Sequence, residues 1–174
     1  MSVTSVVITK EQADNCEAIQ SLYNIGMCLF TYSGADGSTF KEFMDALPDF
    51  LKSYFPTSTS KIVVVSEELK NSLTDDELYA MLKHEEGHFT LNHLDNCSAG
   101  VLCSETIEIE ADNYALQYVS ANTLEAGLFK AVAFFVSRIL LSMGLEDEKD
   151  VYDELIAECH VVQSERLANL RKFK

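Results

Sequence analysis

Apolar residues recur along most of this chain at the three- and four-residue spacing of amphipathic helices. Two short β-branched stretches, at residues 3–9 and 61–66, instead favour strands. Helices are predicted over residues 11–30, 39–54, 67–73, 75–92, 104–119, 123–142, 147–157 and 162–172, with Pro48 disturbing the second and a glycine-containing loop at 33–38. The pattern therefore predicts a helix-dominated α+β domain with a small β-sheet.

The helix predicted over residues 75–92 begins at a capping box. Thr74 can accept a hydrogen bond from a free backbone amide of the first turn, and Glu77 can reach back to the cap. Leu78 and Met81 then recur at helical spacing and Phe89 resumes the stripe, so most of one face can pack against a core.

The same helix carries the run HEEGH, which has the spacing HExxH. Four residues apart on a helix, His84 and His88 lie on one face and can bind a single tetrahedral metal ion. Glu85 would lie beside a water on that metal, where a carboxylate can act as general base in hydrolysis. The alternative, a solvated helix face with charges placed by chance, is weak because the chain has only four histidines. The motif predicts a zinc hydrolase.

A catalytic zinc usually has a third protein ligand, and the acidic segment ETIEIEAD is the candidate source. Glu108 and Asp112 are one helical turn apart and share a face, whereas Glu110 is turned roughly 200° away from Glu108. Glu108 is therefore the predicted ligand, and Glu105 is the alternative. Asp112 is predicted to accept the spare ring N–H of a ligand histidine, foremost that of His84.

His93 suggests a second arrangement, HExxHxxGxxH, in which a third histidine replaces the acidic ligand. That pattern needs its third histidine where this chain has Leu94, and a glycine where it has Leu91. We therefore interpret His93 as a residue of the helix C-terminus, favoured there by the helix dipole, and not as a ligand.

Three ordered segments, KIVVVS, LTDDELYAMLKHEEGH and EIEAD, together resemble the gluzincin metallopeptidases of the HtpX and CAAX-prenyl-protease type. The resemblance spans residues 61–172. It implies a zincin-like fold with the sheet over the HExxH helix, and a Zn²⁺-dependent endopeptidase with His84, His88 and Glu108 as ligands and Glu85 as catalytic base. The short segment between His88 and Glu108 makes the chain similar to the compact minigluzincins and, in spacing, to the ImmA/IrrE peptidases.

The C-terminal segment HVVQSERLANL is similar to a further motif of these peptidases, HPxxxERIxxL. The resemblance brings His160 to the cleft as a candidate catalytic residue that donates to the developing oxyanion. Its alternatives are a pH-sensitive auxiliary ligand or a structural histidine. Arg166 is predicted to be a structural ion-pair partner. The chain departs from the family at Glu86, where an apolar residue is usual, and at Val161, where proline is usual.

Length and composition bound the remaining expectations. At 174 residues and 47% hydrophobic content, residues 1–174 are expected to form a single domain. The net charge of −15 disfavours nucleic acid as a partner. Five cysteines without zinc-ribbon spacing favour reduced thiols, and no secretory signal is visible at the N-terminus. A soluble, cytoplasmic protein is expected.

Two segments have alternative interpretations. The apolar stretch 126–145 contains Lys130 and Arg138, so a buried or amphipathic helix is expected and no integral membrane segment. The strand at 61–66, if it forms the edge above the cleft, could bind an extended substrate through its main chain; otherwise it is a core strand.

The sequence as a whole predicts a zinc-dependent metalloendopeptidase that hydrolyses peptide bonds of a peptide or protein substrate. The alternatives are an ImmA/IrrE-like regulatory peptidase with one dedicated protein target, and a non-catalytic binding module in which zinc holds the fold together. The oligomeric state is left open.

Overall fold

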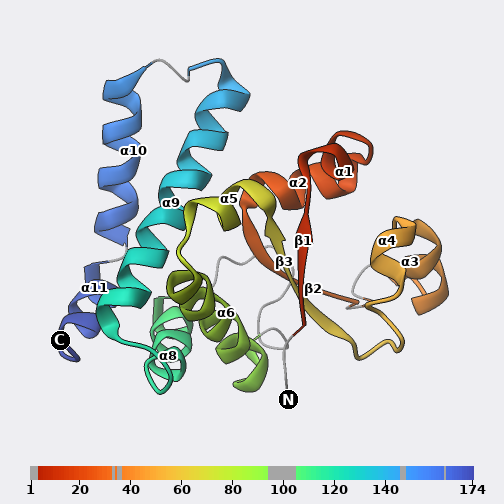
Figure 1. The fold of residues 1–174 in the computed structure, drawn as a ribbon, viewed down its shortest axis with the longest axis horizontal. Helices are drawn as coiled ribbons and strands as arrows, with labels where there is room; N and C mark the ends of the chain where they lie inside the picture. The colour runs from red at the N-terminus through yellow and green to blue at the C-terminus, as the bar shows by residue number, and fades with distance from the viewer. Residues whose placement is uncertain (1–3, 33, 35–36, 94–104, 146–147, 163) are drawn as a thin grey trace.

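A computed structural model describes residues 4–32, 34, 37–93, 105–145, 148–162 and 164–174 (Figure 1). Its strands are β1 (Thr4–Ile8), β2 (Met27–Thr31) and β3 (Lys61–Ser66). Its helices are α1 (Lys10–Asp14), α2 (Glu17–Ile25), α3 (Phe40–Ala46), α4 (Asp49–Lys52), α5 (Glu67–Ser72), α6 (Asp75–Thr90), α8 (Glu105–Ala115), α9 (Ala121–Met143), α10 (Lys149–Val162) and α11 (Ser164–Arg171). Helices make up 66% of the structure, in agreement with the helix-dominated α+β prediction.

The sheet is mixed and has the strand order β1-β3-β2. β1 runs parallel to β3, with Val6 opposite Val64, and β2 runs antiparallel to β3, with Cys28 opposite Val64. β3 is thus the central strand, so of the two interpretations of this segment the core strand is confirmed and the edge strand is not. Its unbroken β-branched run suits a strand that is buried on both faces. Among the described strands, the edges are β1 and β2.

The strand β2 was not predicted, because residues 11–30 read as one helix. Instead α1 and α2 are separate, and α2 ends at Gly26, whose φ is 93°. Only glycine adopts such a conformation readily, and a Cβ at this position would lie 2.7 Å from the Phe134 ring. The apolar residues that follow, from Met27 to Thr31, pair with β3, so tertiary pairing overrides the local helical pattern.

The helix predicted over residues 39–54 is divided at Pro48. Thr39 caps α3 with a complete capping box, and α3 ends before Leu47. Pro48, which has no N–H to donate, is the N-cap of α4.

Helices cover both faces of the sheet. On one face, Ile8, Ile62 and Val64 pack in a cluster with residues of α2 and α4, such as Ile19 and Leu51. On the other face, the alternate residues of the strands pack against α5, α6 and α9: Met27, Val63 and Val65 with Leu69, Met81 and Leu124. The sheet therefore lies against α6, the helix that carries HEEGH, as predicted.

The apolar segment predicted to be a helix is α9, which forms an antiparallel hairpin with α10 (Figure 1). By length and composition alone α9 could cross a membrane, a test that core helices of soluble proteins also pass. Its two cations pair with the body of the protein: Lys130 Nζ lies 2.6 Å from Glu77 Oε2, and Arg138 pairs with Glu68. These pairs hold α9 against α5 and α6.

Candidate metal site

The site begins with the start of α6. Thr74 accepts from the Glu77 amide and Glu77 accepts from the Thr74 amide, so the predicted capping box is confirmed. From this start the helix runs unbroken through His84 and His88, and both rings are buried.

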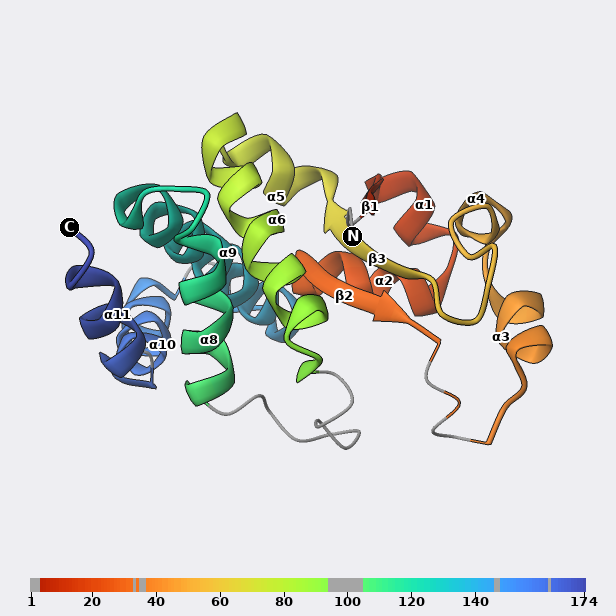
Figure 2. The ribbon, with the colours of Figure 1, turned by 90° about the horizontal axis from the view of Figure 1, so that it is seen from below.

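Gly87, inside the HEEGH run, sets the distance between α6 and α8. A Cβ at this position would lie 3.1 Å from the Ala111 Cα and from the Tyr114 Cβ. The absence of a side chain therefore lets the two helices run side by side in close contact (Figure 2). This contact brings the acidic face of α8 over the two histidines.

Three donor groups converge between these helices: the imidazoles of His84 and His88 and the carboxylate of Glu108. His84 Nε2 lies 3.1 Å from His88 Nε2 and 3.3 Å from Glu108 Oε2. His88 Nε2 lies 3.5 Å from Glu108 Oε1. The structure thus places the three predicted ligands together.

These separations fit a zinc ion. Ligand atoms about 2.0–2.1 Å from a tetrahedral zinc are about 3.3 Å from one another, which is close to all three distances found here. Two imidazole nitrogens and one carboxylate oxygen are also a common donor set for catalytic zinc, with one position left for a water or substrate. The assignment of the three residues as ligands stays a prediction.

His84 is held from behind by Asp112. Its Nδ1 lies 2.9 Å from Asp112 Oδ1, the contact predicted from the sequence, and Asp112 is fully buried. Arg166 neutralises this carboxylate with two hydrogen bonds, of 2.6 Å from Nε to Oδ2 and 2.8 Å from Nη2 to Oδ1. The Asp112 carboxylate therefore orients His84 while it is itself fixed by a buried guanidinium.

Arg166 also reaches the predicted third ligand, since its Nη1 lies 3.0 Å from Glu108 Oε2. Its predicted role as an ion-pair partner is confirmed, and it contacts two acidic residues of α8. Glu105, the alternative ligand, points elsewhere: its Oε1 accepts from the backbone amides of Glu165 and Arg166 at the start of α11. Glu105 therefore anchors the helix that carries Arg166.

His88 has a different partner, His93. The two Nδ1 atoms are 3.0 Å apart, and His93 Nε2 lies 3.0 Å from Glu110 Oε2. His93 is outside the group of candidate ligands, as predicted, but it is buried and paired at both nitrogens. The sequence interpretation, a residue at a helix end, missed these contacts.

The charges of the site shift the pKa values of its members. Burial opposes the charged form of His84, but its contacts with Asp112 and Glu108 outweigh burial and raise the pKa to about 9. Burial and the neighbouring His84 lower the pKa of His88 to about 4. Burial would raise the pKa of Glu108, yet His84 and Arg166 hold it at about 2. The metal-free site thus pairs a protonated His84 with an ionised Glu108.

Glu85, the predicted base, is half-buried beside this cluster. It forms no hydrogen bond or ion pair with another described residue, in contrast to Glu108 and Asp112. Burial raises its pKa, and the negative charge of Glu108 adds to that, whereas His84 and Arg166 lower it. Its carboxylate is thus available to take up a proton.

Glu86 occupies a position that is usually apolar in gluzincins. Its carboxylate lies 2.6 Å from Lys83 Nζ and accepts a hydrogen bond from the Tyr114 hydroxyl. Lys83 Nζ in turn lies 4.6 Å from the centre of the Tyr118 ring. Glu86 is therefore compensated by Lys83 of α6 and Tyr114 of α8.

Some predicted residues lie outside what the structure describes. The backbone of His160 belongs to α10, but its side chain is outside the described part, so its role stays a prediction. The same holds for the side chain of Cys159 and for all of Cys97 and Cys103. The described cysteines, Cys16 and Cys28, are free thiols.

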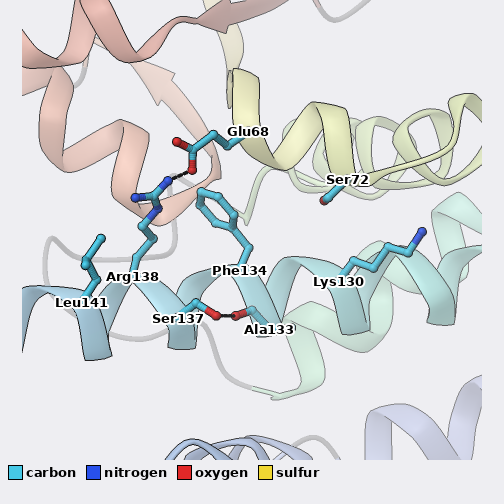
Figure 3. A pocket seen from close by; sticks show the side chains of 8 residues that line it. All are labelled: Glu68, Ser72, Lys130, Ala133, Phe134, Ser137, Arg138 and Leu141. Atoms are coloured by element: carbon cyan, nitrogen blue, oxygen red, sulfur yellow. Dashed lines mark hydrogen bonds and ion pairs between the residues drawn. The ribbon is translucent and has the colours of Figure 1, made fainter. Parts of the chain in front are cut away.

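A pocket of about 510 Å³ lies between α5 and α9 (Figure 3). Its cations already have partners, Arg138 with Glu68 and Lys130 with Glu77. It is lined by none of the three candidate ligands, so it is separate from the metal site.

Comparison with known proteins gives one match. Residues 50–107 match the model of peptidase family M48, a stretch that includes His84, Glu85 and His88 and ends just before Glu108. No curated protein and no solved structure matches the chain. M48 peptidases depend on a metal, generally zinc, which agrees with the donor group between α6 and α8. The match, which covers about a third of the chain, supports a zinc metallopeptidase of the gluzincin M48 (HtpX-like) type.

Proposed function

We propose that the chain is a metalloendopeptidase in which His84, His88 and Glu108 hold one Zn²⁺ and Glu85 is the general base. The observation that carries this proposal is the convergence of the three donor groups. His84 Nε2 lies 3.1 Å from His88 Nε2 and 3.3 Å from Glu108 Oε2, and His88 Nε2 lies 3.5 Å from the other oxygen of that carboxylate, Oε1, separations close to those around a tetrahedral zinc. When bound, zinc would lower the pKa of a water and polarise the substrate carbonyl. The proposal includes a zincin-like fold for a single domain, residues 1–174.

Three residues around the proposed metal site have separate roles in catalysis. Glu85 takes the proton from the attacking water and delivers it to the leaving amine; its lack of a partner among the described residues supports this role. Asp112 holds the Nδ1–H of His84, which keeps Nε2 free to bind the metal. Arg166 offsets the buried charges of Asp112 and Glu108, so these carboxylates stay ionised.

The edge strand β2 is the better candidate for substrate binding than β3, which is central. β2 lies beside α6 (Figure 2), and its residue Met27 shares a core cluster with Met81 of that helix. The pKa of the Cys28 thiol on β2 is raised to about 12, mainly by burial and further by the negative charge of Glu85. Glu85 therefore lies close enough to this strand to influence its charge state. An extended peptide added along β2 would thus have its backbone near the catalytic base.

Substrates are proposed to be peptides or proteins, and nucleic acid is not expected, given the net charge of −15. A cytoplasmic location without an integral membrane segment is also part of the proposal; the free thiols of Cys16 and Cys28 support it. An ImmA/IrrE-like regulatory role with one protein target would use the same site.

The test compares the wild type with Glu85→Gln, a nearly isosteric change. Zinc content should stay at one ion per chain, whereas cleavage of a mixed peptide library should fall by at least about 100-fold, the usual contribution of a general base. Equal cleavage by both proteins would remove Glu85 from the mechanism. Zinc binding without any cleavage by the wild type would favour the non-catalytic module.

A further inference from the structure

We propose that His93 and Glu110 form a positioning relay for His88, in which His88 donates to His93 and His93 donates to Glu110. The relay would fix both the tautomer and the ring orientation with which His88 meets the metal. This inference rests on the proposed function, because it gives His88 the role of a ligand. It assigns His93 as a positioning residue and not as a ligand.

The positions of the ring protons support this direction of the relay. His88 Nε2 faces the donor group, 3.1 Å from His84 Nε2, so it must keep its lone pair and the ring proton must lie on Nδ1. That N–H points at His93 Nδ1, 3.0 Å away, which must therefore accept. The proton of His93 then lies on Nε2, 3.0 Å from Glu110 Oε2, and an ionised carboxylate can only accept. One assignment of protons satisfies every contact.

Burial sets the cost of losing this arrangement. His93 is only 4% exposed, and a buried imidazole whose ring nitrogens lack hydrogen-bond partners is unfavourable. The Glu110 side chain is 54% exposed, so the relay runs from the metal site to the surface of α8. A histidine that only complemented the helix dipole would not need a partner at each ring nitrogen.

The backbone is shaped to make the contact. Five residues along an ideal helix turn a side chain by about 500°, which would leave His93 about 140° away from His88. The structure avoids this because α6 ends at Thr90, with Leu91 as its C-cap, and Asn92 adopts a φ of 60°. Asparagine tolerates this left-handed conformation better than most residues. The turn folds His93 back beneath His88.

The tautomer of a metal-bound histidine is commonly set by its second nitrogen, usually through a carboxylate or a carbonyl group. At His84 a carboxylate does this directly, through Asp112. At His88 the second nitrogen contacts His93, and His93 in turn contacts the Glu110 carboxylate. Each of the two predicted ligand histidines is thus connected by hydrogen bonds to a carboxylate of α8: His84 directly to Asp112, and His88 through His93 to Glu110.

The test measures the dissociation constant of Zn²⁺ by competition with a chromophoric chelator at one fixed pH. His93→Leu removes the acceptor, whereas His93→Asn keeps an oxygen near the position of Nδ1. Glu110→Ala removes the end of the relay from a largely exposed position, and Asp14→Asn removes an exposed ion-pair carboxylate far from the site as the matched control. Visible absorption of the Co²⁺-loaded proteins reports the ligand geometry independently of activity.

We expect the zinc affinity of His93→Leu to fall about 10- to 100-fold, as is usual when the partner of a ligand is lost. His93→Asn and Glu110→Ala should weaken binding by a smaller factor, and Asp14→Asn should not change it. Should His93→Leu fail to fold, weaker binding by Glu110→Ala than by Asp14→Asn supports the relay. Affinities of all folded variants within twofold of wild type would overturn it and leave the proposed function intact. A wild type that binds no zinc would overturn both.

Discussion

The two histidines of HEEGH lie one helical turn apart, yet they are held in different ways. His84 forms a hydrogen bond with Asp112, a fully buried carboxylate. Arg166, which follows Asp112 by 54 residues and lies on α11, neutralises that carboxylate. His88 meets His93, a neighbour in sequence, and through it the largely exposed Glu110. One side of the site is thus built by long-range packing of α6, α8 and α11, and the other by a local turn.

This difference predicts that one side of the site matters for the stability of the fold and the other for metal binding. On the His84 side, the Asp112 carboxylate and the Arg166 guanidinium are buried and the Glu108 carboxylate is partly buried, and each depends on the others for compensation. On the His88 side, the only formal charge of the relay lies at the surface, where water can replace a lost partner. We therefore expect substitutions beside His84 to lower the stability of the fold, and substitutions beside His88 to lower mainly the affinity for the metal.

The largest contrast is expected from removing one carboxylate on each side. Asp112→Ala leaves Arg166 buried without its main partner and should lower the free energy of unfolding by about 3–5 kcal/mol. Glu110→Ala, the matched change at an exposed position, should lower it by less than about 1 kcal/mol. Urea unfolding of the two metal-free variants measures both values. Equal losses would show that the two sides do not differ as described.

The pH dependence of zinc binding should distinguish the two histidines next. His84, with a pKa of about 9, is protonated at neutral pH, whereas His88, with a pKa of about 4, is already neutral. Zinc needs the lone pair of each ring, so below pH 9 it must displace one proton, from His84. Below the pKa of about 7 of a zinc-bound water, affinity should therefore fall about tenfold per pH unit, or ~100-fold from pH 7 to pH 5.

Calorimetry in buffers of different ionisation enthalpy checks this directly. At pH 6, where His84 is still protonated and a zinc-bound water, with a pKa of about 7, is mostly not ionised, about one proton should be released for each zinc bound. Release of no proton would contradict the strong pairing of His84 with Asp112 and Glu108, and release of two would contradict the neutral state of His88.

The smallest expected effect concerns the local turn beneath His88. Asn92→Gly and Asn92→Ala both remove the side chain, but only glycine adopts a φ of 60° without steric cost. The alanine variant should be less stable than the glycine variant by about 1 kcal/mol, and it should bind zinc more weakly because His93 is displaced. Thermal unfolding and zinc titration measure both. An alanine variant as stable as the glycine variant would show that the turn does not require this conformation.

The parts of this site that follow local rules were predictable from the sequence. The capping box at Thr74 fixes where α6 starts, and helical periodicity then places His84 and His88 on one face. The same periodicity places Glu108 and Asp112 together on α8 and turns Glu110 away from them. The structure reproduces each of these placements because they depend on the geometry of single helices.

The parts that depend on pairing distant segments were not predictable. Residues 27–31 look helical when read alone, and only the neighbouring β3 makes them a strand. The central position of β3 likewise depends on β2, so it could not be read from its own residues. Read alone, His93 is either a metal ligand or a residue of a helix end. The signal for its actual contacts is Asn92, a residue type that tolerates the left-handed conformation of this turn.

The most direct test of the central claim is X-ray absorption at the zinc edge of the zinc-loaded wild type. We predict one zinc per chain, two imidazole nitrogens and one or two oxygens at about 2.0–2.1 Å, and no sulfur neighbour. A sulfur neighbour at about 2.3 Å, which would mean cysteine ligation, or fewer than two imidazoles would contradict the site built from His84, His88 and Glu108.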